Sequence, residues 1–197
     1  MHPEDFLTPE EFKQLLAHAR TPRETALLRL LGGVGLRVSE VASLKKEHIN
    51  QLEGYIFISQ AKGGKDRTTV APKSVFAALA ALNIDHGFLF PGYQAGHIST
   101  WEIGHILDQI ALAAGLQQTR PPAIGQKRER KRVTAHLLRH SYASWVLDKG
   151  LPVSDLQGQL GHASLATTGI YLQRRPNHRR ESFRAIDDDF RVEEKVI

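Results

Sequence analysis

The sequence predicts a mainly α-helical fold with one small antiparallel β-sheet, an α+β class. Apolar residues recur at helical spacing in several segments, and most of these segments begin at an N-cap signal. Strand character is concentrated in one stretch, residues 55–70, where aromatic and β-branched residues flank a Gly-Gly pair. With 197 residues, 41% of them hydrophobic, the chain suits one globular domain with its own core.

The helices are predicted from capping signals and apolar periodicity. Thr8 and Glu11 form a capping box with proline at the first helical position, so a helix begins there. Ser99 and Glu102 form a second capping box, and Thr134 has the character of a third N-cap. The predicted helices begin at residue 9 and cover residues 22–31, 72–82, 99–115 and 134–150, with a further short helix from residue 154.

Residues 55–59 and 68–70 predict the two strands of a β-hairpin. Between them lies the segment K-G-G-K at residues 62–65, whose glycines permit the positive φ angles of a tight turn. Charged residues are common at solvent-exposed hairpin tips, so these lysines have an ordinary structural explanation.

Composition limits the classes of function. The net charge of +5 and the pI near 9.6 favour a polyanionic partner. The absence of cysteine excludes disulfides and thiolate metal sites and agrees with a reducing cytoplasm. No export signal is visible, and the apolar stretches fall far short of the roughly 18 residues that span a bilayer. We therefore expect a cytoplasmic protein without a membrane partner.

Residues 134–172 carry the chemistry. His136 and Arg139 are three residues apart on a predicted helix, so they project from one face and can touch a common anion. Gly161 permits a tight turn that presents His162, and Tyr171 follows nine residues later. A tyrosine with a pKa near 10 needs neighbouring cations and a base to act as a nucleophile. Taken singly, an H-x-x-R pair more often lies on the solvent-exposed face of a helix, and a tyrosine usually packs in the hydrophobic core.

Taken together, the H-L-L-R-H helix, the L-G-H turn and the T-T-G-I-Y segment resemble the tyrosine recombinases, the phage integrase family. The resemblance covers residues 7–172. The segment G-L-R-V-S-E at residues 35–40 resembles the first arginine box of the family, and A-K-G-G-K-D-R resembles its hairpin with a catalytic lysine. The resemblance implies six catalytic residues, Arg37, Lys62, His136, Arg139, His162 and Tyr171, with Glu40 supporting Arg37.

The implied activity is site-specific recombination of double-stranded DNA through a 3′-phosphotyrosine intermediate. This recombination would be an integration, excision, inversion or resolution. The resemblance implies that it needs no metal, ATP or other cofactor. Two alternatives remain open: a nicking-closing enzyme similar to type IB topoisomerases, and a DNA-binding regulator that does not cleave.

Further basic residues are predicted to contact the DNA backbone. Lys65 and Arg67 follow the hairpin turn, and a basic run leads directly into His136. A charge run is usually a solvated loop, but this one is also well placed to neutralise phosphates beside the cleavage site. The run contains Lys127, Arg128, Arg130, Lys131 and Arg132.

Two rival interpretations are weaker. His136 and His140 have the spacing of a zinc-binding helix, but Leu137 occupies the position where H-E-x-x-H needs its glutamate. Tyr142 lies near His136 in sequence, yet six helical positions turn it away from that face.

The resemblance also predicts the domain organisation. Residues 1–197 are expected to be a single catalytic domain without the N-terminal core-binding domain found in most integrases. Either the chain is a fragment, or it resembles the short recombinases that lack this domain. Residues 173–197 are expected to pack on a neighbouring protomer, and a frayed tail has nearly equal weight. The expected partners are double-stranded DNA, further copies of the chain in a tetramer on DNA, and accessory DNA-bending proteins. When the protein is bound to DNA, we expect it to be associated with the nucleoid.

Overall fold

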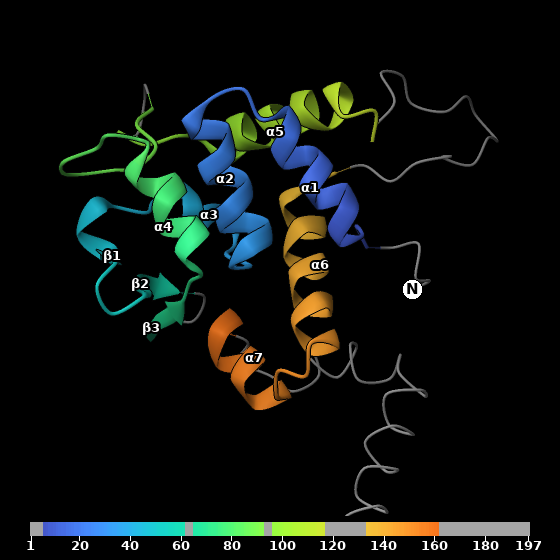
Figure 1. Cartoon of the computed structure of the whole chain (residues 1–197). Helices are drawn as coiled ribbons and strands as arrows, with labels where there is room; N and C mark the ends of the chain where they lie inside the picture. Colours follow the sequence, from blue (N-terminus) through green and yellow to red (C-terminus); the bar gives the residue numbers. More distant parts are fainter. Residues whose placement is uncertain (1–5, 62–64, 93–95, 117–132, 162–197) are drawn as a thin grey trace, which may run out of the picture. The chain divides into compact units, whose positions relative to one another are not determined.

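The computed structural model describes residues 6–61, 65–92, 96–116 and 133–161 (Figure 1). All of them belong to one compact unit that ends at Gly161. Among the residues described, no helix has both the length and the apolar character needed to cross a membrane. The elements are α1 (Pro9–His18), α2 (Pro22–Gly33), α3 (Val38–Ala42), the short 3-10 helix η2 (Lys46–His48), β1 (Ile49–Asn50), β2 (Tyr55–Ala61), β3 (Lys65–Val70), α4 (Lys73–Ala80), α5 (Thr100–Ala113), α6 (Ala135–Asp148) and α7 (Val153–Leu160).

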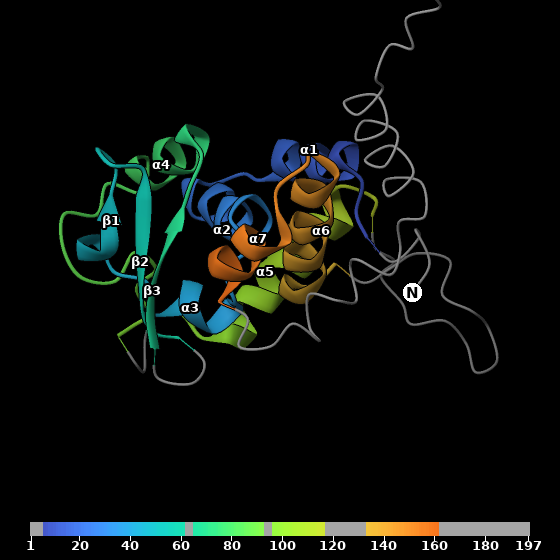
Figure 2. The ribbon, with the colours of Figure 1, turned by 90° about the horizontal axis from the view of Figure 1, so that it is seen from below.

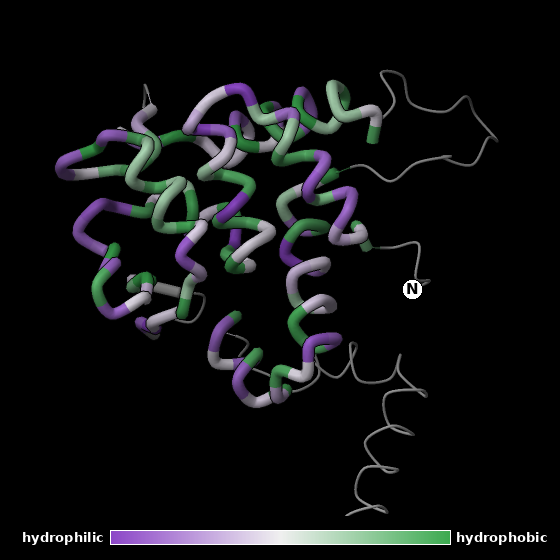
Figure 3. The backbone as a smooth tube through the Cα atoms, viewed as in Figure 1, coloured by the Kyte–Doolittle hydropathy of each residue, from purple (hydrophilic) through white to green (hydrophobic). Residues whose placement is uncertain are grey.

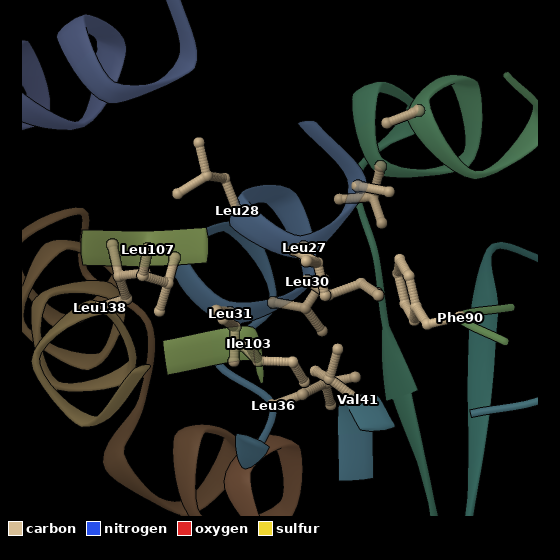
Figure 4. Close-up of a cluster of buried hydrophobic side chains, with 14 of the residues drawn as sticks. Leu27, Leu28, Leu30, Leu31, Leu36, Val41, Phe90, Ile103, Leu107 and Leu138 are labelled. Atoms are coloured by element: carbon tan, nitrogen blue, oxygen red, sulfur yellow. The ribbon is translucent and has the colours of Figure 1, made fainter. Parts of the chain in front are cut away.

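The leucine-rich helix α2 lies at the centre of the core. It packs against α1, α3, α4, α5 and α6, and its four leucines at residues 27, 28, 30 and 31 are fully buried (Figure 4). The other helices show the periodic alternation of hydrophobic and hydrophilic residues that one buried face requires (Figure 3). The predicted mainly helical class with a small antiparallel sheet is therefore confirmed.

The capping signals are realised to different degrees. Thr8 and Glu11 form the predicted reciprocal box, because each side chain accepts the other residue's backbone N–H, at 3.1 and 2.8 Å. Ser99 accepts the backbone N–H of Glu102 at 3.0 Å, but the Glu102 carboxylate binds Arg23 instead of returning to Ser99. The second predicted box is thus only half formed, because a partner far along the chain competes for the glutamate.

The sheet is an antiparallel meander in the order β1-β2-β3. Its hairpin pairs Tyr55 with Val70 and Ile56 with Thr69, which confirms the predicted strand pair, although both strands run closer to the turn than expected. Strand β1 was not predicted, because two residues are too few to show an alternating pattern. In Figure 2, α7 lies between the sheet and α6 and contacts both.

Gly35 joins α2 to α3 at a point of close approach. Its φ is +77°, and a Cβ there would lie 2.4 Å from the Tyr142 ring and 2.9 Å from Leu160. Both the backbone conformation and the space therefore require glycine.

We predict that Gly35→Ala destabilises the protein more than Gly54→Ala does. Gly54 also has a positive φ, +75°, but nothing lies within 4 Å of its added Cβ. The conformational penalty of about 1–2 kcal/mol is common to both variants, whereas overpacking adds about 1–3 kcal/mol at Gly35 only. Urea denaturation of the two variants measures the difference, and equal losses would show that Tyr142 and Leu160 move aside freely.

Candidate active site

Arg37 and Glu40 are joined by the geometry of one helix start. Arg37 is the N-cap residue of α3, so the side chain of Glu40, three residues later, reaches back to it. The Glu40 carboxylate accepts two hydrogen bonds from Arg37, one from its backbone N–H at 2.8 Å and one from its guanidinium at 2.8 Å. The contact predicted between the two residues is present, and 24% of the Arg37 side chain stays exposed.

Arg67 reaches the same carboxylate from β3. Its two terminal nitrogens donate to the two Glu40 oxygens at 2.7 and 2.9 Å, and only 10% of its side chain is exposed. Arg67 is therefore paired with a buried glutamate, and the DNA-backbone contact predicted for it stays a prediction. Sequence reasoning missed this pairing, since Arg67 and Glu40 are 27 residues apart.

The interactions close into a ring at the end of α7. Arg37 donates its second terminal nitrogen to the carbonyl of Gly161 at 2.9 Å. Gly161 ends α7 with φ at +63°, as its predicted turn requires, and a Cβ there would lie 2.9 Å from Arg67. Arg67 in turn donates its Nε to the carbonyl of Gln159 in the same turn at 3.4 Å. The order around the ring is therefore Arg67, Glu40, Arg37, Gly161 and, through the backbone of α7, Gln159 and back to Arg67. We call these five residues the arginine ring.

The charge of Glu40 depends on its partners. Burial opposes ionisation and raises the pKa of Glu40, but the Arg67 hydrogen bonds, the Arg37 backbone N–H and the charges of the two arginines together outweigh it. The pKa of Glu40 therefore lies below its usual value. The carboxylate stays ionised, and the two guanidiniums around it leave a local excess of one positive charge.

Arg139 approaches the same place from α6. Thr134 caps this helix as predicted, since its hydroxyl accepts the Leu137 N–H at 3.1 Å. Arg139 is 7% exposed and donates to the carbonyls of Gly35 at 2.5 Å and Leu160 at 2.8 Å. Arg37 and Arg139 are thus bound to the consecutive carbonyls of residues 161 and 160. Two guanidiniums held this close repel each other, so an anion between them would stabilise both.

His136 lies one turn before Arg139 and is exposed. Partial burial first, and the Arg139 charge second, lower the pKa of His136, so its ring is neutral at pH 7. Its Nε2 is hydrogen bonded to the Nε2 of His140, with the ring centroids 4.0 Å apart. One of the two Nε2 atoms must donate and the other accept, so only one of them carries a proton in this arrangement.

Tyr142 is a poor candidate for the nucleophile. Its hydroxyl accepts from the Gln159 amide at 3.3 Å, and burial raises the pKa of Tyr142. Gln159 also pairs with the edge of β3, because its amide accepts the Val70 N–H at 3.0 Å and donates to the Val70 carbonyl at 2.6 Å. This clamp between α7 and β3 was not predicted, since no local pattern marks a glutamine that pairs 89 residues away.

The remaining predicted residues lie outside the described part of the chain, except that Lys65 begins β3. No cluster of three histidine, aspartate or glutamate side chains able to hold a metal ion occurs among the residues that the structure describes. The predicted residues outside are Lys62, His162, Tyr171, Lys127, Arg128, Arg130, Lys131 and Arg132.

Comparison with known proteins gives a consistent result. The model of the Phage integrase family matches residues 5–178. The tyrosine recombinase XerA of Pyrococcus furiosus is 34% identical over 185 residues, covering 89% of this chain and 59% of that protein. Tyrosine recombinase XerC of Oceanobacillus iheyensis is 32% identical, covering 90% of this chain and 59% of that protein. The chain therefore spans about three fifths of the length of these relatives.

Solved structures agree with the sequence comparison. The crystal structure of XerA recombinase superposes with a TM-score of 0.73 at 29% identity, covering 91% of this chain and 64% of that one. A structure of XerH site-specific recombinase superposes with a TM-score of 0.68, at an identity of 24% that shows the fold alone, and covers 85% of this chain and 50% of that one.

We predict that Glu40→Gln lowers the free energy of unfolding at pH 7 by about 3–5 kcal/mol, because two partly buried guanidiniums lose their buried counter-charge. A carboxylate whose folded pKa lies below its ordinary value of 4.5 contributes stability above that pH, and this contribution is lost as the pH falls through the folded pKa. Urea denaturation between pH 7 and pH 3 should therefore show a shallower acid decline in the variant. Glu10→Gln, exposed on α1, is the matched control. An unchanged acid decline in Glu40→Gln would contradict the prediction.

Proposed function

The chain belongs to the phage integrase family, and on this basis we propose that it cuts and rejoins double-stranded DNA through a 3′-phosphotyrosine, as a site-specific recombinase. The observation that carries the proposal is the pair of guanidiniums, Arg37 and Arg139, fixed on the successive carbonyls of Gly161 and Leu160. A guanidinium carries five N–H donors, so binding a carbonyl does not prevent it from also donating to a phosphate oxygen. A scissile phosphate between them meets two fixed cations.

The proposed reaction is an in-line displacement at phosphorus. The hydroxyl oxygen of Tyr171 attacks, a bond from that oxygen to phosphorus forms, and the bond from phosphorus to the 5′-oxygen breaks. Lys62 donates a proton to the departing 5′-oxygen, and His136 assists removal of the tyrosine proton. His162 donates a hydrogen bond to a non-bridging oxygen. Attack by a different 5′-hydroxyl reverses the step and exchanges strands.

The electrostatics support these roles. The negative charge that develops on the pentacovalent phosphorus is stabilised by cations already fixed before the reaction. The lowered pKa of His136 supports its role in proton transfer, because a neutral imidazole has a lone pair to accept with. Arg67, which contacts no reacting atom in this scheme, acts as a positioning residue for Arg37 through Glu40.

The partner that fits this chemistry is double-stranded DNA. Structures with the same fold include a transposon integrase in complex with a circular intermediate DNA, which supports the choice of partner. The basic run around residues 127–132 would supply further contacts to backbone phosphates. We further propose a cytoplasmic protein bound to the nucleoid, with residues 173–197 packing on a neighbouring protomer in a tetramer on DNA.

No external energy source is required in this scheme. The energy of the cleaved bond is kept in the phosphotyrosine, and the sequence contains no Walker-type phosphate loop. The fixed cations take the electrostatic part that a divalent metal plays elsewhere. Wild-type cleavage is accordingly expected to persist in the presence of a chelator.

We predict that Tyr171→Phe abolishes covalent trapping on a nicked suicide substrate while DNA binding stays nearly unchanged, because only the nucleophilic oxygen is lost. A duplex with the flanking sequence of the protein's own gene, nicked beside the cleavage position, supplies the trapping substrate, and denaturing gel electrophoresis measures the covalent product. On supercoiled plasmids that carry the same sequence, joining of two sites identifies a recombinase, and relaxation alone identifies a topoisomerase-like enzyme. Trapping of the variant at the wild-type level would exclude Tyr171, and no trapping of the wild type would favour the non-cleaving regulator.

We predict that cleavage by Lys62→Ala is rescued by a substrate with sulfur at the bridging 5′ position. A thiolate leaves without a proton, so the general acid becomes dispensable. Lys65→Ala, on the same hairpin, is the matched control and should show no selective rescue. Rates of cleavage on the oxygen and sulfur substrates measure the effect. An equal loss of cleavage rate on both substrates would show that Lys62 is only a charged residue at the hairpin tip.

A further inference from the structure

A cleft of about 340 Å³ opens beside the arginine ring, between α3, η2 and β2. Glu40 contributes to its wall and also binds Arg37, so the cleft adjoins one of the proposed catalytic cations. The scheme above assigns no role to it. Its polar and aromatic lining includes Ser39, Ser43, Lys45, His48, Ser59 and Phe88.

Lys45 supplies an ordered cation at this cleft. Its ammonium lies 5.1 Å from the centroid of the Phe88 ring, a cation–π contact that restrains the flexible side chain while the residue stays exposed. His48 accepts the Lys45 backbone N–H at 3.3 Å, and partial burial together with the Lys45 charge lowers the pKa of His48. The histidine is therefore neutral at pH 7, and Lys45 provides the positive charge.

Serine residues line the same cleft. The Ser39 and Ser59 hydroxyls make no hydrogen bond to any other residue within the described ranges, so both can donate to a ligand. Ser43 is exposed and currently donates to the Ser39 carbonyl at 3.0 Å. The Glu40 carboxylate does not oppose an anion here, because both of its oxygens are bound by Arg37 and Arg67.

One ordered cation with uncommitted hydroxyls is a suitable environment for a phosphate diester. We propose that this cleft binds a backbone phosphate of the DNA that flanks the phosphate held by Arg37 and Arg139. The inference rests on the proposed function, because it assumes that a strand crosses the arginine ring.

The spacing identifies which phosphate occupies the cleft. Ser43 follows Arg37 by six residues along α3, which corresponds to about 9 Å at a rise of about 1.5 Å per residue. Successive phosphates of one strand lie about 7 Å apart, because each one rises by about 3.4 Å and also turns about the helix axis. The cleft therefore holds the phosphate one or two nucleotides from the cleaved one.

Salt-dependent binding of the full chain tests the charge. Lys45→Met should reduce the slope of log affinity against log salt by about 0.9, the loss of one phosphate contact, on the duplex used for trapping. Lys46→Met is the matched control, because Lys46 is the next residue and carries the same charge but does not line the cleft. Fluorescence anisotropy measures both, and equal urea midpoints confirm that both variants fold.

Neutral methylphosphonate linkages, placed one at a time around the mapped cleavage position, test the location. The neutral linkage one or two nucleotides from that position should weaken wild-type binding but cause no further loss in Lys45→Met. Ser59→Ala should show the same dependence on that linkage without a change in salt slope.

The outcomes separate the two proposals. If the wild type is trapped on DNA but Lys45→Met and Lys46→Met behave alike, or if the effect of Lys45→Met is the same at every linkage, the cleft is not a phosphate site and the proposed function stands. If the wild type binds no DNA, both proposals fail.

Discussion

The buried carboxylate of Glu40, held between two arginines, is the interaction on which the site depends. Burying an ion pair removes its members from water, and this cost is offset only when every partner is in place with good geometry. Glu40 meets that condition with bonds of 2.7–2.9 Å to Arg37 and Arg67. One arginine belongs to the start of α3 and the other to β3, so the pairing joins the sheet to the helical core.

The last turn of α7 organises the other side of the site. The final carbonyls of a helix have no partner within the helix and carry partial negative charge, so they attract cations. Here the carbonyls of Leu160 and Gly161 bind Arg139 and Arg37. Gln159 holds the same turn against β3 through the Val70 backbone. A displacement of α7 would therefore move both guanidiniums at once. The stability of this short helix and the geometry of the proposed phosphate site depend on each other for that reason.

Sequence reasoning predicted the local parts of this arrangement and missed the distant ones. The contact between Arg37 and Glu40 and the cap at Thr134 are interactions between residues three apart, and helical geometry fixes them wherever the helix forms. The partner of Arg67 could not be predicted, because its strand and α3 are brought together by the fold. Glu102 failed as a capping-box partner for the same reason, since Arg23 on α2 competes for it. Local patterns define elements, and packing decides which charged groups meet.

Arg37 and Arg139 differ from a surface arginine because hydrogen bonds within the protein already hold both side chains in place. A surface arginine loses side-chain entropy when it binds a phosphate, whereas Arg37 and Arg139 have already lost it to protein carbonyls and to Glu40. The repulsion between the two guanidiniums is present before any ligand arrives, and the folded core holds them despite it. An incoming phosphate therefore gains from relief of that repulsion without reorganising the protein. In the proposed reaction the greater negative charge of the pentacovalent phosphorus would gain more, and this difference between ground state and transition state would accelerate the step.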